Sequence, residues 1–154
     1  MWSRARGFSL IELMVVVALV AIMAGLAAPS FRGFVAGQRV KAAASDFAMA
    51  AIFARSEAIK RNANVTIAPL TSGATGWKDG WTVAAGATEL SRQQAYSDVT
   101  FSGPSSAITY TGTGRLSATV STTTITGSDG RARCVALDLS GMPKSTTSSD
   151  GTCP

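Results

Sequence analysis

The sequence predicts an α+β fold in which a long N-terminal helix packs on an antiparallel β-sheet or β-sandwich-like head. Residues 8–28 are almost wholly apolar, residues 29–62 keep a helical spacing of apolar side chains, and residues 63–154 change to short β-type runs between Gly, Ser and Asp turns. The chain has 154 residues, which leaves room for this helix and for one modest globular domain.

The apolar run from Phe8 to Ala28 predicts a transmembrane helix. It holds 21 residues, enough to cross a bilayer at about 1.5 Å per residue, and Glu12 is its only charge. Arg4 and Arg6 precede the run, so the positive-inside rule predicts a single pass with a cytoplasmic N-terminus and a head on the other side of the membrane. A secretory signal peptide is the alternative, but its apolar core has only about 7–15 residues, and a carboxylate has no purpose in it.

Residues 29–62 form the amphipathic half of the predicted helix. Pro29 lies where a proline more often bends a membrane helix than ends it. Apolar side chains recur after it at spacings of 7, 4, 3 and 4, and they belong to Val40, Phe47, Ala51, Ala54 and Ala58. We expect the helix to end near Asn62, and its apolar face needs a cover that the head can supply.

Six short runs of strand-forming residues follow the helix. They are Val65–Ile67, Trp81–Val83, Val99–Phe101, Ile108–Tyr110, Thr119–Thr126 and Arg133–Leu139. The Ser/Thr-rich stretch 117–128 could also be a linker or an O-glycosylated segment, and we favour an edge hairpin. Residues 145–154 have the composition of a disordered tail, which Cys153 could pin to the strand that carries Cys134.

Two glycine-bracketed tryptophans, Trp77 and Trp81, stand next to the second of these runs. Large aromatic side chains beside tight turns belong more often to a core than to a ligand-stacking surface. We therefore expect both indoles in the core of the head. In the last run, Val135, Leu137 and Leu139 alternate with more polar residues, which predicts a strand with one face on that core.

The composition argues against an enzyme. The chain has no histidine, which excludes histidine-based nucleophile systems and histidine-ligated zinc, and no residues suggest a catalytic, metal or cofactor site. Its two cysteines, Cys134 and Cys153, are too few for a structural zinc site and predict a disulfide in an oxidising compartment. The net charge of +5 is too small to indicate nucleic-acid binding by itself.

The sequence Gly7-Phe8-Ser9-Leu10-Ile11-Glu12-Leu13, with Pro29 further on, resembles the class III leader of type IV prepilins and type II secretion pseudopilins. The resemblance implies that residues 1–7 are a leader, that prepilin peptidase cuts between Gly7 and Phe8, and that Phe8 is then N-methylated. A lone carboxylate in hydrocarbon must be protonated or meet a cation. Glu12 is therefore expected to pair with the new Phe8 amine of another subunit during assembly.

Two further segments, Ala54–Ile67 and Gly76–Trp81, resemble the GspH/FimT-type pseudopilins and minor pilins. This resemblance implies a structural minor pilin or pseudopilin that takes part in type IV pilus assembly. It also implies other pilins and prepilin peptidase as partners, and residence in the bacterial inner membrane and then in the pilus or pseudopilus. The alternatives are a type II secretion pseudopilin and a pilus-borne DNA receptor for natural transformation.

The DNA-receptor alternative depends on Gly130-Arg131-Ala132-Arg133 and on Gly141-Met142-Pro143-Lys144. FimT-like pilins carry a GRxR signature associated with DNA binding, and Arg131, Arg133 and Lys144 could contact phosphates. In that family the signature follows the final strand, whereas here the GRAR sequence precedes it. Solvated turn arginines are the competing interpretation.

Overall fold

The computed structural model describes residues 8–148 and 150–153, with the side chains of residues 26–30 excepted. The chain divides after Phe34 into two compact units. The first holds the N-terminal part of helix α1 (Leu10–Arg61), and the second, here called the head unit, holds the rest of α1 and every strand. The α+β class predicted from the sequence is confirmed.

Helix α1 continues past Pro29 and ends at Arg61. Asn62 follows in the left-handed conformation, with φ of 48°, which an asparagine tolerates better than most residues. The amide of Ala63 donates to the carbonyl of Ala58 at 3.2 Å, which closes the helix end with a Schellman-type bond. Glu57 accepts from both Lys60 and Arg61 in this last turn.

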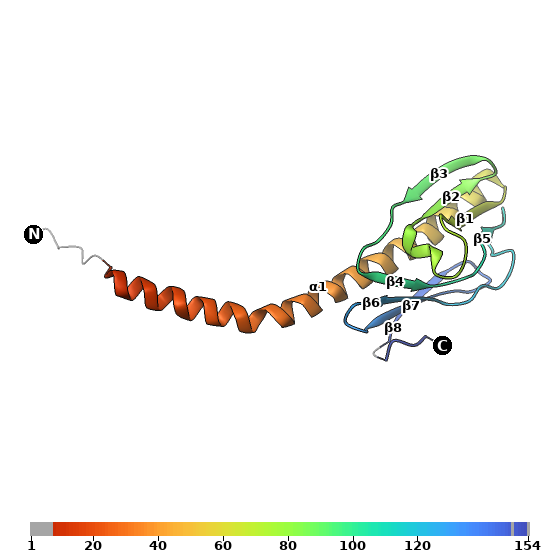
Figure 1. The fold of residues 1–154 in the computed structure, drawn as a ribbon. Coiled ribbons are helices and arrows are strands. Elements are labelled where there is room, and N and C mark those ends of the chain that lie inside the picture. Colours follow the sequence, from red (N-terminus) through yellow and green to blue (C-terminus); the bar gives the residue numbers. More distant parts are fainter. Residues whose placement is uncertain (1–7, 149, 154) are drawn as a thin grey trace, which may run out of the picture. The chain divides into compact units, whose positions relative to one another are not determined.

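The head unit contains two antiparallel sheets of four strands each (Figure 1). Sheet 1 has the order β3 (Thr88–Gln93), β2 (Trp81–Ala85), β1 (Val65–Pro69) and β5 (Ile108–Tyr110). Sheet 2 has the order β4 (Val99–Ser102), β6 (Thr123–Gly127), β7 (Ala132–Leu137) and β8 (Pro143–Ser148). A short 3-10 helix, η1 (Gly76–Asp79), leads into β2. The C-terminal part of α1 packs on these sheets.

The side of α1 that faces the sheets is made mainly of alanines. Val40, Phe47, Ala51, Ala54 and Ala58 are all buried, as their spacing predicted. Alanine side chains let the strands approach the helix closely, so one large residue can fill the remaining space. Phe47 is that residue, and it is fully buried.

Phe47 contacts the two tryptophans edge to face, with ring centroids 5.3 Å from Trp77 and 5.5 Å from Trp81. The Trp77 indole nitrogen donates to the carbonyl of Pro104 at 2.8 Å, which satisfies its one polar atom. Gly80 follows η1 with φ of +101°, and a Cβ there would lie 2.2 Å from the carbonyl oxygen of Gln93. The prediction that both indoles belong to the core is confirmed.

Sheet 2 differs from the sequence prediction at its polar strands. Residues 143–148 form β8 although the tail from residue 145 was expected to be disordered, and β7 supplies the backbone partners. Residues 117–128 were expected to form an edge hairpin, and only 123–127 form a strand, β6, which lies between β4 and β7. Its inward side chains Thr123 and Ile125 are buried, because β6 is an interior strand.

The core face of β7 also departs from simple alternation. Val135 and Leu137 are buried as predicted, but the strand ends at Leu137, and Leu139 is 42 % exposed in the turn that follows. Cys134 is buried as well, although its side chain points to the opposite face from Val135. Both faces of this strand are therefore covered.

Phe47→Ala should lower the free energy of unfolding of the head unit by about 3–5 kcal/mol, because it leaves a cavity between α1 and the two indoles. The matched control is Phe53→Ala on the outer side of the same helix, where the side chain is 37 % exposed and the loss should be much smaller. Urea denaturation followed by tryptophan fluorescence measures both. Equal losses for the two variants would contradict this account of the core.

Candidate assembly site and nucleic-acid surface

The N-terminal part of α1 carries the residues predicted to act in assembly. The carbonyl of Ser9 accepts the amides of Glu12 and Leu13, each at 3.1 Å, and so begins the helix. Glu12 lies in the first turn, where a carboxylate is favoured by the helix dipole. Phe8 is 72 % exposed. Gly7, the other residue of the predicted cleavage site, lies outside the described residues.

The helix around Glu12 is exposed and apolar on every side. Each large apolar side chain from Leu10 to Met23 is between 44 % and 76 % exposed. One shallow groove on this surface is wholly aliphatic apart from a thioether, and its lining consists of Leu13, Met14, Val17, Ala18 and Ala21. Such a surface is not stable in water without a cover.

Over the residues that the structure describes, no helix is both long enough and apolar enough to cross a membrane. The transmembrane helix predicted for residues 8–28 therefore stays a prediction.

A disulfide joins Cys134 of β7 to Cys153 with a Cα–Cα distance of 5.6 Å, as the sequence predicted. It holds the C-terminal segment against the face of sheet 2 that points away from the core, which explains why Cys134 is buried there. Asp150 orders this segment by accepting from the Ser148 hydroxyl and from the Thr152 amide. These hydrogen bonds lower the pKa of the Asp150 carboxyl to about 2.

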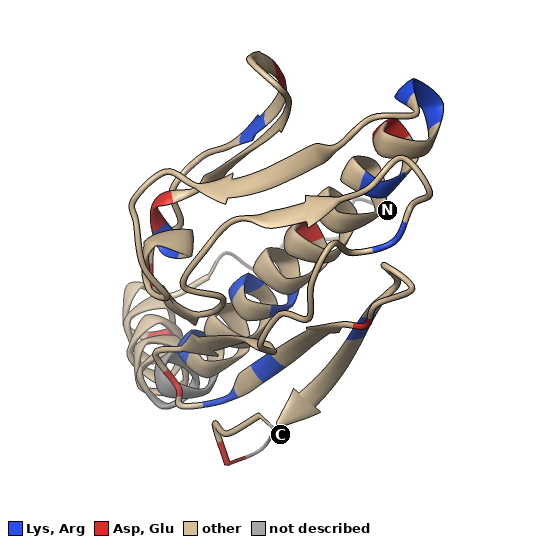
Figure 2. Ribbon diagram, turned by 90° about the vertical axis from the view of Figure 1, so that its right-hand side faces the viewer, with Lys and Arg blue, Asp and Glu red and all other residues tan. Residues whose placement is uncertain are grey.

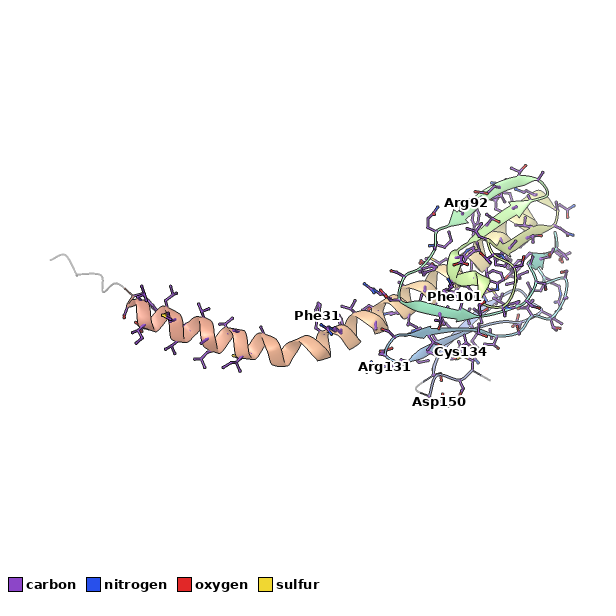
Figure 3. The ribbon with its side chains drawn as sticks, in the orientation of Figure 1. Phe31, Arg92, Phe101, Arg131, Cys134 and Asp150 are labelled. Atoms are coloured by element: carbon purple, nitrogen blue, oxygen red, sulfur yellow. A yellow bond between two sulfur atoms is a disulfide. The ribbon has the colours of Figure 1, made fainter. Side chains whose placement is uncertain are left out.

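Arg131 directly precedes β7 (Figure 3), and Arg133 is the second residue of that strand. Arg131 is exposed in the turn before the strand, and its guanidinium lies 3.6 Å from the carboxylate of Asp129. Arg133 is half-buried. Its side chain leaves the strand on the same face as Val135 and Leu137, which is the face that packs on the core. The positive charge of this pair is thus partly neutralised and partly covered.

Lys144 does not join the two arginines. It pairs with Ala136, whereas Arg133 pairs with Thr147, three residues further along β8. Cross-strand partners share a face and successive side chains alternate, so Lys144 and Arg133 point to opposite faces of sheet 2. Figure 2 shows the basic positions of the head unit spread over several elements, with acidic positions beside many of them. The three residues therefore do not form one phosphate-binding surface.

The sequence analysis missed an exposed apolar stripe on the outer side of α1 in the head unit. It consists of Met49, Ile52, Phe53 and Ile59, which are 37–55 % exposed. These residues lie on a different face of the helix from Phe47 and Ala51. The sequence could have revealed them as apolar side chains on a helix face that the core does not use.

The long helix, the two antiparallel sheets and the apolar N-terminal segment that begins near Glu12 together define a protein of the type IV pilin class. The family model for the type II transport protein GspH matches residues 43–141, and the model for the prokaryotic N-terminal methylation motif matches residues 2–28. The chain belongs to the GspH family of pilin-like proteins. Membership of this family identifies it as a structural subunit rather than an enzyme, and the methylation motif implies a membrane-anchored protein of a pilus or pseudopilus.

Two crystal structures of the Pseudomonas aeruginosa type IV minor pilin FimU are similar to this chain. The form in space group P21 has a TM-score of 0.60 at 21 % identity and covers 79 % of this chain and 96 % of that chain. The form in space group P65 has a TM-score of 0.57 at 21 % identity and covers 74 % and 96 %. This likeness is one of fold. No curated protein matches the sequence.

Replacement of both cysteines by alanine should lower the free energy of unfolding of the head unit by about 3 kcal/mol, because the disulfide closes a loop whose ends are 19 residues apart. Urea denaturation with and without a reductant measures the change. Reductant should destabilise the unaltered protein to the same degree and leave the double variant unaffected. A reductant-insensitive midpoint for the unaltered protein would contradict the assignment.

Arg131→Ala/Arg133→Ala should leave DNA retention by the head unit unchanged in a gel shift at two salt concentrations, because these arginines and Lys144 do not form a common surface. The matched control is Lys60→Ala/Arg61→Ala, which removes the same charge from the end of α1. If only the first variant abolished a strongly salt-dependent shift, the DNA-receptor alternative would be supported instead.

Proposed function

We propose that this chain is a minor pilin or pseudopilin that enters the bacterial inner membrane as a single-pass precursor with a cytoplasmic N-terminus and a periplasmic head. Prepilin peptidase cuts it between Gly7 and Phe8 and Phe8 is N-methylated. The mature subunit then leaves the membrane and enters a type IV pilus or pseudopilus through α1. The match of the methylation motif to residues 2–28 supports this processing.

The exposed apolar surface of α1 carries the proposal. The large side chains from Leu10 to Met23 are all accessible, and the outer stripe of Met49, Ile52, Phe53 and Ile59 continues the apolar character within the head unit. Lipid can cover the first of these surfaces before assembly, and helices of other pilins can cover both afterwards. A subunit that functioned alone would leave them in water.

Glu12 gives this apolar association a specific axial position. A carboxylate in a low-dielectric helix bundle is strongly destabilised unless a cation lies beside it. Cleavage after Gly7 creates a new amine at Phe8, four residues before Glu12. The amine of one subunit and the Glu12 carboxylate of its neighbour neutralise each other only at one axial offset, so the charge pair fixes how the helices align.

Pilus and secretion pseudopilus both remain candidate destinations. The matching family is described by a type II transport protein, and the similar crystal structures are of a type IV minor pilin. The role of α1 is the same in either filament. The DNA-receptor function has no such support, because the geometry of Arg131, Arg133 and Lys144 disfavours a joint contact with a phosphate backbone.

Glu12→Ala should reduce entry of the full-length subunit into filaments strongly, by tenfold or more if the ion pair contributes about 1.4 kcal/mol. Sheared filaments and membranes are compared by immunoblot in cells that carry the complete assembly system. Intact mass provides the internal control: the variant and the unaltered protein should both lack residues 1–7 and carry one added methyl group.

The matched variant Glu89→Ala removes an exposed carboxylate of the head that pairs with Arg92, and it should enter filaments normally. Loss of the whole apolar segment from the mature protein would overturn the proposal in favour of a secretory signal peptide. Normal filament entry of Glu12→Ala would remove the role assigned to the carboxylate.

A further inference from the structure

A groove of about 210 Å³ lies between α1 and the edge strand β3 in the head unit. Its helix side is formed by Asp46, Met49, Ala50 and Phe53, and its sheet side by Trp81, Ser91 and Gln93. The lining therefore combines an aromatic and thioether floor with one carboxylate and two uncharged polar side chains. It borders the outer apolar stripe of α1, since Met49 and Phe53 belong to both.

The groove exists because β3 carries small or polar side chains where it faces the helix. Ser91 pairs with Val83 and Gln93 pairs with Trp81, so these side chains share the face that the core residues of β2 use. Val83 and Trp81 are buried, but a serine cannot fill the space that a branched apolar residue would occupy. The edge of sheet 1 thus stays open beside α1.

Asp46 is the only charged residue of the groove. One of its carboxylate oxygens accepts the hydroxyl of Tyr96 at 2.9 Å, and Tyr96 stacks on Trp81. Burial, and then the Asp46 carboxylate, raise the pKa of the Tyr96 hydroxyl, so the tyrosine donates a proton to this bond at any physiological pH. Among the ion pairs of the described residues none involves Asp46. A half-buried carboxylate with one neutral donor can still accept a cation.

The same chain presents a segment that complements this groove. Arg32 is exposed on α1. Phe31 directly before it is 65 % exposed, and Phe34 two residues after it is 60 % exposed. Figure 3 shows the Phe31 side chain projecting from the helix. Six other basic residues of the described chain have a carboxylate partner, namely Arg39, Lys60, Arg61, Lys78, Arg92 and Arg131, whereas Lys41, Arg55, Arg115, Arg133 and Lys144 are in no ion pair. Arg32 takes part in none of these pairs.

We propose that the groove binds the Phe31–Phe34 segment of a second copy of this chain, with the Arg32 guanidinium on the Asp46 carboxylate and a phenylalanine ring on Met49 and Phe53. The proposal rests on the proposed function, since it names a contact between assembled subunits. The contact is an arginine–carboxylate pair flanked by apolar side chains. The apolar contacts exclude water from the ion pair, and the paired hydrogen bonds of the guanidinium fix the orientation of the two groups. A carboxylate-free groove would accept any apolar helix.

Site-specific cross-linking of the full-length chain in membranes tests the contact. One copy carries Gly33→Cys, next to Arg32, and a differently tagged copy carries Ser91→Cys on the sheet side of the groove, so Arg32 and Asp46 stay intact and a mixed dimer can form only between chains. The described cysteines are both in the disulfide, which leaves the introduced thiols as the reactive pair. The matched control places the second cysteine at Glu89, an exposed acidic position on the same strand as Ser91. We expect at least about tenfold more mixed dimer with Ser91→Cys than with Glu89→Cys.

Charge exchange separates this inference from the proposed function. Arg32→Asp and Asp46→Arg should each lower self-association of the full-length chain in detergent about tenfold, and the two changes combined should restore it. Equal cross-linking at Ser91 and Glu89, or a cross-link from Ser91→Cys to another pilin in place of a second copy, would overturn the proposed contact. If Glu12→Ala blocks filament entry while the charge-exchange variants behave normally, the proposed function stands and the groove contact fails.

Discussion

The fit between Phe47 and the alanine side of α1 is the contact on which the rest of the head depends. Small side chains at positions 43, 44, 51, 54 and 58 bring the helix close to both sheets, and Phe47 fills the space between them against Trp77 and Trp81. A helix face with several large residues would hold the sheets further away. The aromatic cluster then extends through Trp81 to Tyr96 and Phe101, so one helix residue connects both sheets.

Because this alanine side is committed to the core, the opposite side of α1 is free to serve another purpose. It carries Met49, Ile52, Phe53 and Ile59, which a monomeric domain would have no reason to place in water. The head therefore does not bury its helix completely. It covers one side and leaves the other as a surface that has the same apolar character as the N-terminal part of α1. Under the proposed function, one helix thus serves both the domain and the filament.

Sequence reasoning recovered the parts of the fold whose side chains face an apolar core. The helix face of Val40 to Ala58, the strand that starts at Val65 and the two tryptophans all carry a local pattern. Strands β3 and β8 carry none, since their residues are mostly exposed and polar, and their order comes from backbone bonds to distant partners on β2 and β7. The disulfide was readable from the cysteine count, but the burial of Cys134 on the second face of β7 was not, because it depends on where the C-terminal segment lies.

The distribution of charge explains why this subunit would associate with a neighbour in one arrangement and not in many. Most acidic side chains of the described head have a basic neighbour or local hydrogen-bond donors, as Glu57 has at the helix end and Asp138 has in its turn, so they contribute little to a long-range field. Glu12 and Asp46 differ, because neither has a cation from its own chain in the described structure: Glu12 lies among apolar side chains, and Asp46 accepts only the neutral Tyr96 hydroxyl beside the outer apolar stripe. An apolar surface alone tolerates sliding, whereas a carboxylate within it penalises every arrangement that fails to supply a cation. Two such acids on one helix would restrict both the axial offset and the rotation of a neighbouring subunit.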